Sequence, residues 1–134
     1  MATRISIPFT LPEVYQGLAA AHGRIYVDDS GLRLEYRVED AVFGVIKSRV
    51  RDLRIPFEEI DDIQFLDRWY RRRFVVQLHS LKLLADFPNS KSGRIVLKIA
   101  RAQRLRMREF CSHLTLLISE EQLRRLDRPD DWRE

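Results

Sequence analysis

Seven short stretches with the pattern of β-strands precede one long amphipathic helix, and this order constrains the fold more than any other feature of the chain. Up to Ile99, apolar side chains recur mostly at every second position, which is the period of a half-buried strand. After Ile99 the period lengthens to that of a helix. The chain is therefore predicted to be mainly β, an antiparallel barrel or sandwich of seven strands closed by a C-terminal helix over about residues 101–118.

The individual elements follow from the same patterns. The apolar stripe of the helix comprises Leu105 or Met107, Phe110, Cys111, Leu114, Leu117 and Ile118. The predicted strands cover residues 24–28, 32–38, 50–55, a stretch that begins at 63, 74–79, 82–87 and 94–99. Asp29-Ser30-Gly31 is typical of a tight hairpin turn, in which Gly31 is free to take a positive φ. Gly44 indicates a bend or bulge within residues 41–46.

The first residues alternate like a strand but carry prolines. Pro8 and Pro12 restrict the segment to an edge strand or an extended arm. Residues 1–16 are therefore predicted to be an arm that supports self-association. Its apolar side chains, Ile5, Ile7 and Phe9, would be buried either against a neighbouring subunit or back on the same chain.

The remaining chain is predicted to divide into a domain of residues 17–118 and a C-terminal segment of residues 119–134. Ser119 with Gln122 resembles a capping box, which predicts a second short helix over 120–126 and a frayed tail after it. Residues 12–22 fit a short helix and a continued extended segment equally well.

The composition is typical of a soluble globular protein, with 45% apolar and 33% charged residues in a chain of 134. The single cysteine, Cys111, excludes an internal disulfide and a multi-cysteine metal site. No apolar run approaches the roughly 20 residues of a membrane-spanning helix. Residues 1–10 lack the apolar core of a signal peptide. We therefore expect a cytoplasmic protein without a cofactor or a transmembrane segment.

Arginine dominates the basic residues. Of the 24 basic residues only Lys47, Lys82, Lys91 and Lys98 are lysines. Arginine binds phosphate and carboxylate groups in a bidentate manner and stacks on aromatic rings. The bias fits either the codon usage of a GC-rich genome or selection for anion binding.

Three segments carry a resemblance to a known fold. They are residues 23–35, residues 53–60 with their Ile-Pro passage, and residues 93–101 leading into the helix. Together they resemble the bacterial branch of the pleckstrin-homology-like (PH-like) superfold over about residues 17–118. The resemblance implies seven strands in two nearly orthogonal sheets, with the helix closing one end.

The resemblance implies no particular ligand, because a superfold does not define what it binds. Lipid-binding members of this superfold hold inositol phosphates with basic residues around the first hairpin loop. Here that loop, residues 28–31, is Asp-Asp-Ser-Gly and is acidic. No ligand contact is therefore carried over to this chain.

The strongest candidate for an interaction surface is a basic and aromatic hairpin within residues 67–73. Its side chains are Arg68, Trp69, Tyr70, Arg71, Arg72 and Arg73. Aromatic residues beside cations suit an anionic membrane surface, single-stranded nucleic acid or a protein interface. The same sequence also fits a solvated hairpin in which Trp69 stacks on an arginine.

Other charged residues are weaker candidates. The helix arginines Arg101, Arg104, Arg106 and Arg108 either extend the basic surface or form the solvated face of the helix. Because a cation is unfavourable at a helix N-terminus, Arg101 indicates an acidic partner. The expected partner is the cluster Glu58, Glu59, Asp61 and Asp62, from this chain or a neighbouring subunit.

No arrangement of residues predicts catalysis. Cys111 and His113 are two positions apart on a helix and therefore point to different faces. The sequence predicts a non-enzymatic binding or assembly module that acts through protein–protein interaction or self-association. The alternative is peripheral binding to anionic membrane lipid through the hairpin of residues 67–73, and nucleic acid is the least favoured partner.

Overall fold

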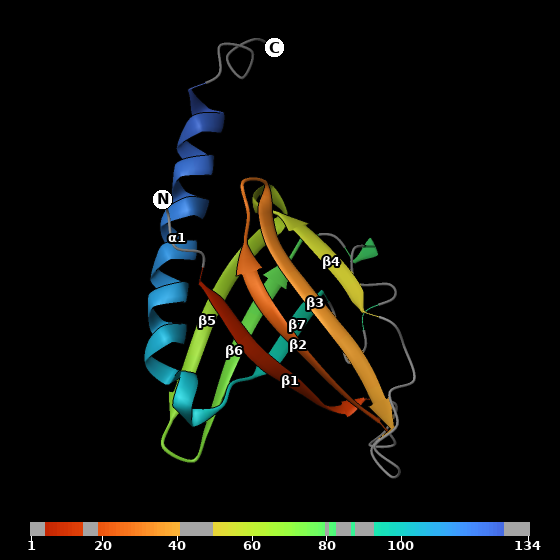
Figure 1. Cartoon of the computed structure of the whole chain (residues 1–134). Helices are drawn as coiled ribbons and strands as arrows, with labels where there is room; N and C mark the ends of the chain where they lie inside the picture. The colour runs from red at the N-terminus through yellow and green to blue at the C-terminus, as the bar shows by residue number, and fades with distance from the viewer. Residues whose placement is uncertain are drawn as a thin grey trace.

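Seven antiparallel strands form one sheet, and a single C-terminal helix packs against it (Figure 1). The computed structural model describes residues 5–14, 19–40, 50–79, 81–82, 87 and 93–127. The strands are β1 Ser6–Val14, β2 Ala19–Val27, β3 Gly31–Asp40, β4 Arg51–Pro56, β5 Ile60–Arg68, β6 Arg71–Leu78 and β7 Arg94–Lys98. The helical elements are the 3-10 turns η1 Phe57–Glu59 and η3 Arg101–Gln103, and α1 Arg104–Leu126. The prediction of a mainly β fold with a C-terminal helix is confirmed.

The strand order is β4-β3-β2-β1-β7-β6-β5, so two meanders meet where β1 lies beside β7. The junction is narrow, because Thr10↔Lys98 is the one residue pair between these two strands in the described part of the chain. β4 and β5 are the outer strands, and within the described residues no pairing between them closes the sheet. α1 packs against β5, η1 and β1, and thus lies across both meanders (Figure 1).

β1 lies inside the sheet, whereas the prolines predicted an edge strand or an arm. It pairs with β2 along most of its length, from Ser6↔Tyr26 onwards. Pro8 is tolerated because, among the described residues, β1 pairs with β7 only at Thr10 and the missing N–H of proline disrupts no ladder there. Arg106 of α1 donates a hydrogen bond to the backbone oxygen of Ser6 at 3.3 Å and so covers part of this gap.

The β2–β3 hairpin is confirmed, but the role of Gly31 differs from the prediction. Its φ is not positive; the one positive-φ glycine among the described residues is Gly93, at 75°. A Cβ atom on Gly31 would lie 2.1 Å from the backbone oxygen of Ile55, so the close approach of β3 and β4 requires glycine. Asp28 shapes the turn, because its Oδ1 accepts hydrogen bonds from the backbone N–H groups of Ser30 and Gly31 at 2.9 and 3.0 Å.

The core lies between the curved sheet and α1. The alternating side chains of β1 and the other strands meet the helix stripe there, and Phe74 packs edge-to-face on Phe110 with ring centroids 6.1 Å apart. Of the two alternatives for the start of the stripe, Met107 is buried and Leu105 is exposed. The stripe therefore begins at Met107.

α1 is longer than predicted. It runs without a break to Leu126, so the predicted helix end at Ile118 and the separate second helix are wrong. Ser119 does not interrupt the helix because good helix formers follow it, and Glu121 pairs with Arg124 at 2.9 Å. Figure 1 shows the last turns of α1 extending past the strands.

Some predicted elements lie outside the described residues. Gly44 and its segment 41–46, residues 1–4, most of the turn at 88–93 and the tail after 127 are among them. Of the predicted strand 82–87, only Lys82 and Phe87 are described, and neither is in a strand. Phe87 is buried and packs edge-to-face on Tyr36.

Candidate functional site

The turn between β5 and β6 exposes two aromatic side chains. Arg68 pairs with Arg71 across the hairpin, so Trp69 and Tyr70 form its tip. Trp69 is 88% exposed and Tyr70 is 58% exposed. Their rings pack edge-to-face with centroids 5.4 Å apart. Because so large an apolar side chain gains little burial among the described residues, the tip is suited to an external partner.

The arginines around the tip have different roles. The guanidinium carbon of Arg71 lies 5.6 Å from the centroid of the Tyr70 ring, so the cation–π contact forms at Tyr70 rather than at Trp69. Arg72 donates hydrogen bonds to the backbone oxygens of Arg68 at 3.2 Å and of Ile99 at 3.4 Å, which holds the hairpin to the end of β7. Arg68 and Arg71 are exposed and available to a partner.

Arg73 lies deeper in the hairpin than its neighbours. It is partly exposed, but its Nε atom is buried and has no hydrogen-bond partner among the described residues. Arg73 is therefore less accessible to a partner than the arginines at the tip.

The start of α1 lies beside this hairpin. Asp67 accepts hydrogen bonds from Arg104 Nε at 2.8 Å and Arg108 Nη2 at 2.7 Å. The Asp67 side chain is only 12% exposed. Burial alone would raise the pKa of Asp67, but the hydrogen bonds and charges of the two arginines outweigh it and lower the pKa below the ordinary value of 3.8.

Asp67 was not predicted as a partner of the helix arginines, and it pairs with Arg104 and Arg108, whereas the acidic cluster was predicted as the partner of Arg101. The predicted acidic cluster is engaged elsewhere in part, since Asp61 pairs with His79 Nδ1 at 2.7 Å. The sequence signal that could have identified Asp67 is the spacing of Arg104 and Arg108, which puts both on one helix face toward a single carboxylate. Arg106 points elsewhere and contacts Ser6.

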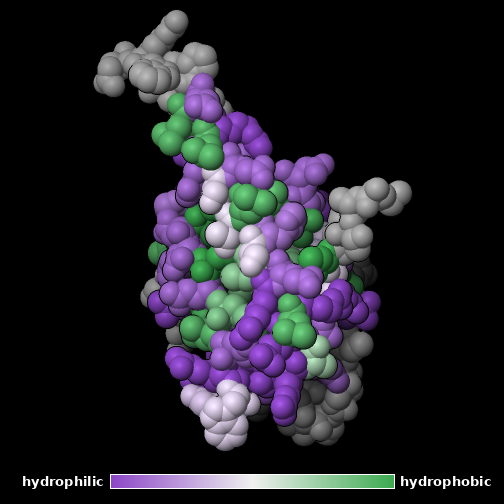
Figure 2. All heavy atoms as spheres, turned by 90° about the vertical axis from the view of Figure 1, so that its left-hand side faces the viewer, coloured by the Kyte–Doolittle hydropathy of each residue, from purple (hydrophilic) through white to green (hydrophobic). Residues whose placement is uncertain are grey.

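The hairpin and the helix start enclose a basic hollow of about 290 Å³. It is lined by Asp67, Arg68, Trp69, Arg72, Arg101, Arg104 and Arg108. Five arginines thus surround one carboxylate, and the excess of positive charge suits an anionic group. Figure 2, which looks onto α1, shows hydrophilic side chains gathered at the lower end, where the helix begins. We call this surface, together with Tyr70 and Arg71, the basic tip.

The predicted self-association residues pack on their own chain. Ile7 and Phe9 are buried in the core, and Ile5 is partly buried against it. To bury Ile7 and Phe9 in a neighbour, β1 would have to leave the sheet between β2 and β7.

The remaining candidate groups are not gathered at one place. Cys111 is half-buried in the helix face toward the core, and burial raises the pKa of its thiol. His113 lines a cavity other than the basic hollow. No three His, Cys, Asp or Glu side chains within the described residues are arranged to hold a metal ion.

None of the helices in the described part of the chain is long and apolar enough to cross a membrane. Comparison with protein-family models, with curated proteins and with solved structures finds no match for this chain.

Proposed function

We propose that this chain is a non-enzymatic binding module whose basic tip contacts an acidic surface of a protein partner. The observation that carries the proposal is the 88% exposure of Trp69 beside arginines from two separate elements, β5–β6 and α1. Tryptophan, tyrosine and arginine are the residue types that dominate protein-interface hot spots. A carboxylate-rich partner would neutralise the guanidinium groups that the single carboxylate of Asp67 leaves uncompensated.

The proposal includes a PH-like fold. Two antiparallel meanders that meet at β1 and β7, followed by a helix across both, support it. Closure into a barrel or into two orthogonal sheets belongs to the same proposal. In lipid-binding members of that superfold the first hairpin loop holds phosphates, whereas here Asp28 accepts hydrogen bonds within its own turn. The binding surface is thus proposed at the β5–β6 tip, in a cytoplasmic protein.

The second candidate is peripheral binding to anionic membrane lipid. Trp69 and Tyr70 protrude together at the end of a hairpin, and aromatic side chains at a tip can enter the interfacial layer of a bilayer. The arginines behind them would then contact lipid phosphates. The two candidates use the same surface and differ in the partner.

The fluorescence of Trp69 reports binding at the basic tip. The chain has two tryptophans, so Trp132→Phe leaves Trp69 as the single tryptophan. Titration of this variant with poly-L-glutamate is expected to shift the emission to shorter wavelength and reduce quenching by acrylamide. Added salt should weaken the effect, because exposed charges are screened within about 8 Å at physiological ionic strength.

A matched pair of charge reversals gives the control. Arg68→Glu with Arg71→Glu should weaken binding at least about tenfold, whereas Arg37→Glu with Arg51→Glu changes the net charge equally at exposed sites on the first meander. Equal effects of the two pairs would contradict the proposal. Quenching of Trp69 by brominated phosphatidylserine vesicles, without any response to poly-L-glutamate, would assign the tip to the membrane instead.

A further inference from the structure

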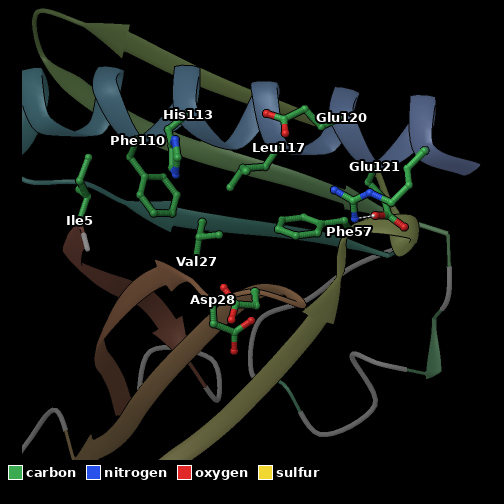
Figure 3. A pocket seen from close by; sticks show the side chains of 11 residues that line it. Ile5, Val27, Asp28, Phe57, Phe110, His113, Leu117, Glu120 and Glu121 are labelled. Carbon is green, nitrogen blue, oxygen red and sulfur yellow. Dashed lines mark hydrogen bonds and ion pairs between the residues drawn. The ribbon is translucent and has the colours of Figure 1, made fainter. Parts of the chain in front are cut away.

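A second cavity, of about 310 Å³, lies between α1 and the β2–β3 turn, away from the basic tip. Its floor is apolar. Figure 3 shows Phe110, Leu117, Val27 and Phe57 facing one another between the helix and the strands. Phe110 and Phe57 belong to the buried core, while Val27 and Leu117 are partly exposed where they pack against it. The cavity therefore exposes the edge of the core to solvent.

The rim of this cavity is acidic. It carries Asp28 and Asp29 from the turn and Glu120 and Glu121 from α1, with Arg124 as the one arginine. Arg124 pairs with Glu121 at 2.9 Å, as the dashed line in Figure 3 shows. Asp28 Oδ2 forms an ion pair with Arg33 Nη1 at 3.6 Å. Neither Asp29 nor Glu120 makes an ion pair with another described residue, so negative charge remains uncompensated on both sides of the cavity.

The basic tip has the complementary properties. It presents an exposed indole with exposed guanidinium groups on either side, at Arg68 and Arg71. An apolar floor suits the indole, and carboxylates on the rim suit the guanidinium groups. The geometry points to a second copy of this chain as the occupant: the basic tip of one copy inserts Trp69 into the acid-rimmed cavity of the next. This inference rests on the proposed function and names the partner.

Trp69 does not occupy the cavity of its own chain, because it is 88% exposed and is not among the residues that line this cavity. Arg104 lines the basic hollow and Glu120 lines the cavity, which separates them by about 24 Å along the helix at 1.5 Å per residue. Each copy therefore keeps one free tip and one free cavity after the first contact. Such a head-to-tail contact is heterologous and builds either a closed ring or an open filament.

The measurement is the native mass as a function of concentration, by sedimentation velocity, at low and at physiological salt. The 16.0 kDa chain is expected to form larger species as its concentration rises, and added salt should oppose their formation. In the Trp132→Phe variant, assembly should be accompanied by a shift of Trp69 emission to shorter wavelength. Thermal unfolding of each variant checks that it is folded.

Two charge reversals test the pairing of the surfaces. Arg68→Glu with Arg71→Glu places carboxylates on both sides of Trp69 and Tyr70, and Asp29→Arg with Glu120→Arg makes the rim basic. Each variant alone should stay monomeric, because the residues that flank Trp69 and Tyr70 then carry the same sign of charge as its own rim. A mixture should assemble again, since these flanking residues then meet a rim of opposite charge on the other variant. The control pair Arg37→Glu with Arg51→Glu should assemble like the unmodified chain.

The outcomes separate this inference from the proposed function. A constant monomer mass together with binding of poly-L-glutamate would overturn the inference and leave the proposed function standing. If the chain neither assembles nor binds poly-L-glutamate, both the inference and the proposed function are overturned. Assembly that persists after reversal of the rim, or no recovery in the mixture, would overturn the inference by assigning self-association to another surface.

Discussion

The two halves of α1 take part in surfaces of opposite charge, and these surfaces are held in different ways. In the first half, Arg104 and Arg108 are anchored by Asp67, a residue far away in the sequence. In the second half, Glu121 is held by Arg124, its neighbour one turn along the same helix. The basic tip therefore depends on the tertiary structure, whereas the helix side of the acidic rim is largely a property of the helix itself.

The two surfaces also differ in their relation to the core. Trp69 and Tyr70 stand on a two-residue turn and are exposed, so a change there leaves the core intact. The cavity floor is the core itself, because Phe57 and Phe110 are part of it. Binding and stability should thus be separable at the tip but not in the cavity.

The largest effect on stability is expected in α1, which lines both surfaces, so that a change in its packing should disturb both of them. Phe110 is buried against Phe74, so Phe110→Ala should lower the free energy of unfolding by about 3–5 kcal/mol. Leu123→Ala, at an exposed position of the same helix, should change it by less than about 0.5 kcal/mol. Urea denaturation measures both, and a similar cost for the two variants would show that α1 does not pack through Phe110.

A smaller effect is expected at the strand end beside the acidic rim. In Gly31→Ala the new Cβ atom would meet the backbone oxygen of Ile55, which is not the end of a flexible side chain and cannot move aside. We expect a loss of about 1–3 kcal/mol in the free energy of unfolding. Binding of poly-L-glutamate at the distant tip should be unchanged when measured below the unfolding transition. Full stability of this variant would contradict the close approach of β3 and β4.

The smallest effect on stability is expected at the basic tip, where the carboxylate of Asp67 makes the stability depend on pH. Because the pKa of Asp67 is lower in the folded chain than its ordinary 3.8, its ionised form stabilises the fold above that pH, and the contribution is lost as the pH falls below it. Asp67→Asn should therefore lower the unfolding midpoint more at neutral pH than in acid well below pH 3.8.

The same substitution should strengthen binding of poly-L-glutamate, since it removes the carboxylate from the basic hollow. Asp28 provides the internal comparison. Its pKa is also lowered: burial opposes the shift, but hydrogen bonds from Ser30 and Gly31 outweigh it. Some loss of stability in acid should therefore remain in the Asp67→Asn variant. If Asp67→Asn shifts the unfolding midpoint by the same amount at every pH, ionisation of the Asp67 carboxylate is not linked to folding.

Local patterns predicted most elements of the fold. The β2–β3 hairpin, β4 and β7 were found because alternation and turn residues act within a few positions of one another. The end of α1 was not, because a serine that resembles a cap is also tolerated inside a helix when strong helix formers follow. The place of β1 was missed for a different reason: proline excludes a fully paired strand, but it is tolerated beside a gap in the pairing.

The candidate site divides in the same way. The exposed aromatic tip was predictable, because two strand patterns flank a short run of arginine, tryptophan and tyrosine. Its extension by helix arginines was one of two alternatives, and the structure brings Arg101, Arg104 and Arg108 to the tip. The anchoring role of Asp67 and the acid-rimmed cavity were not predictable. They depend on contacts between residues that are distant in the sequence.

By itself, the sequence of this protein determined that strands precede a C-terminal helix, which side chains are apolar enough to fill a core, and where arginines accompany aromatic residues. Only the tertiary structure decided that β1 lies between two meanders and that the two halves of α1 meet surfaces of opposite charge. The physical reason is that periodicity and turn preferences are local. Charge pairing and cavities arise where the packing of the sheet against the helix brings distant side chains together.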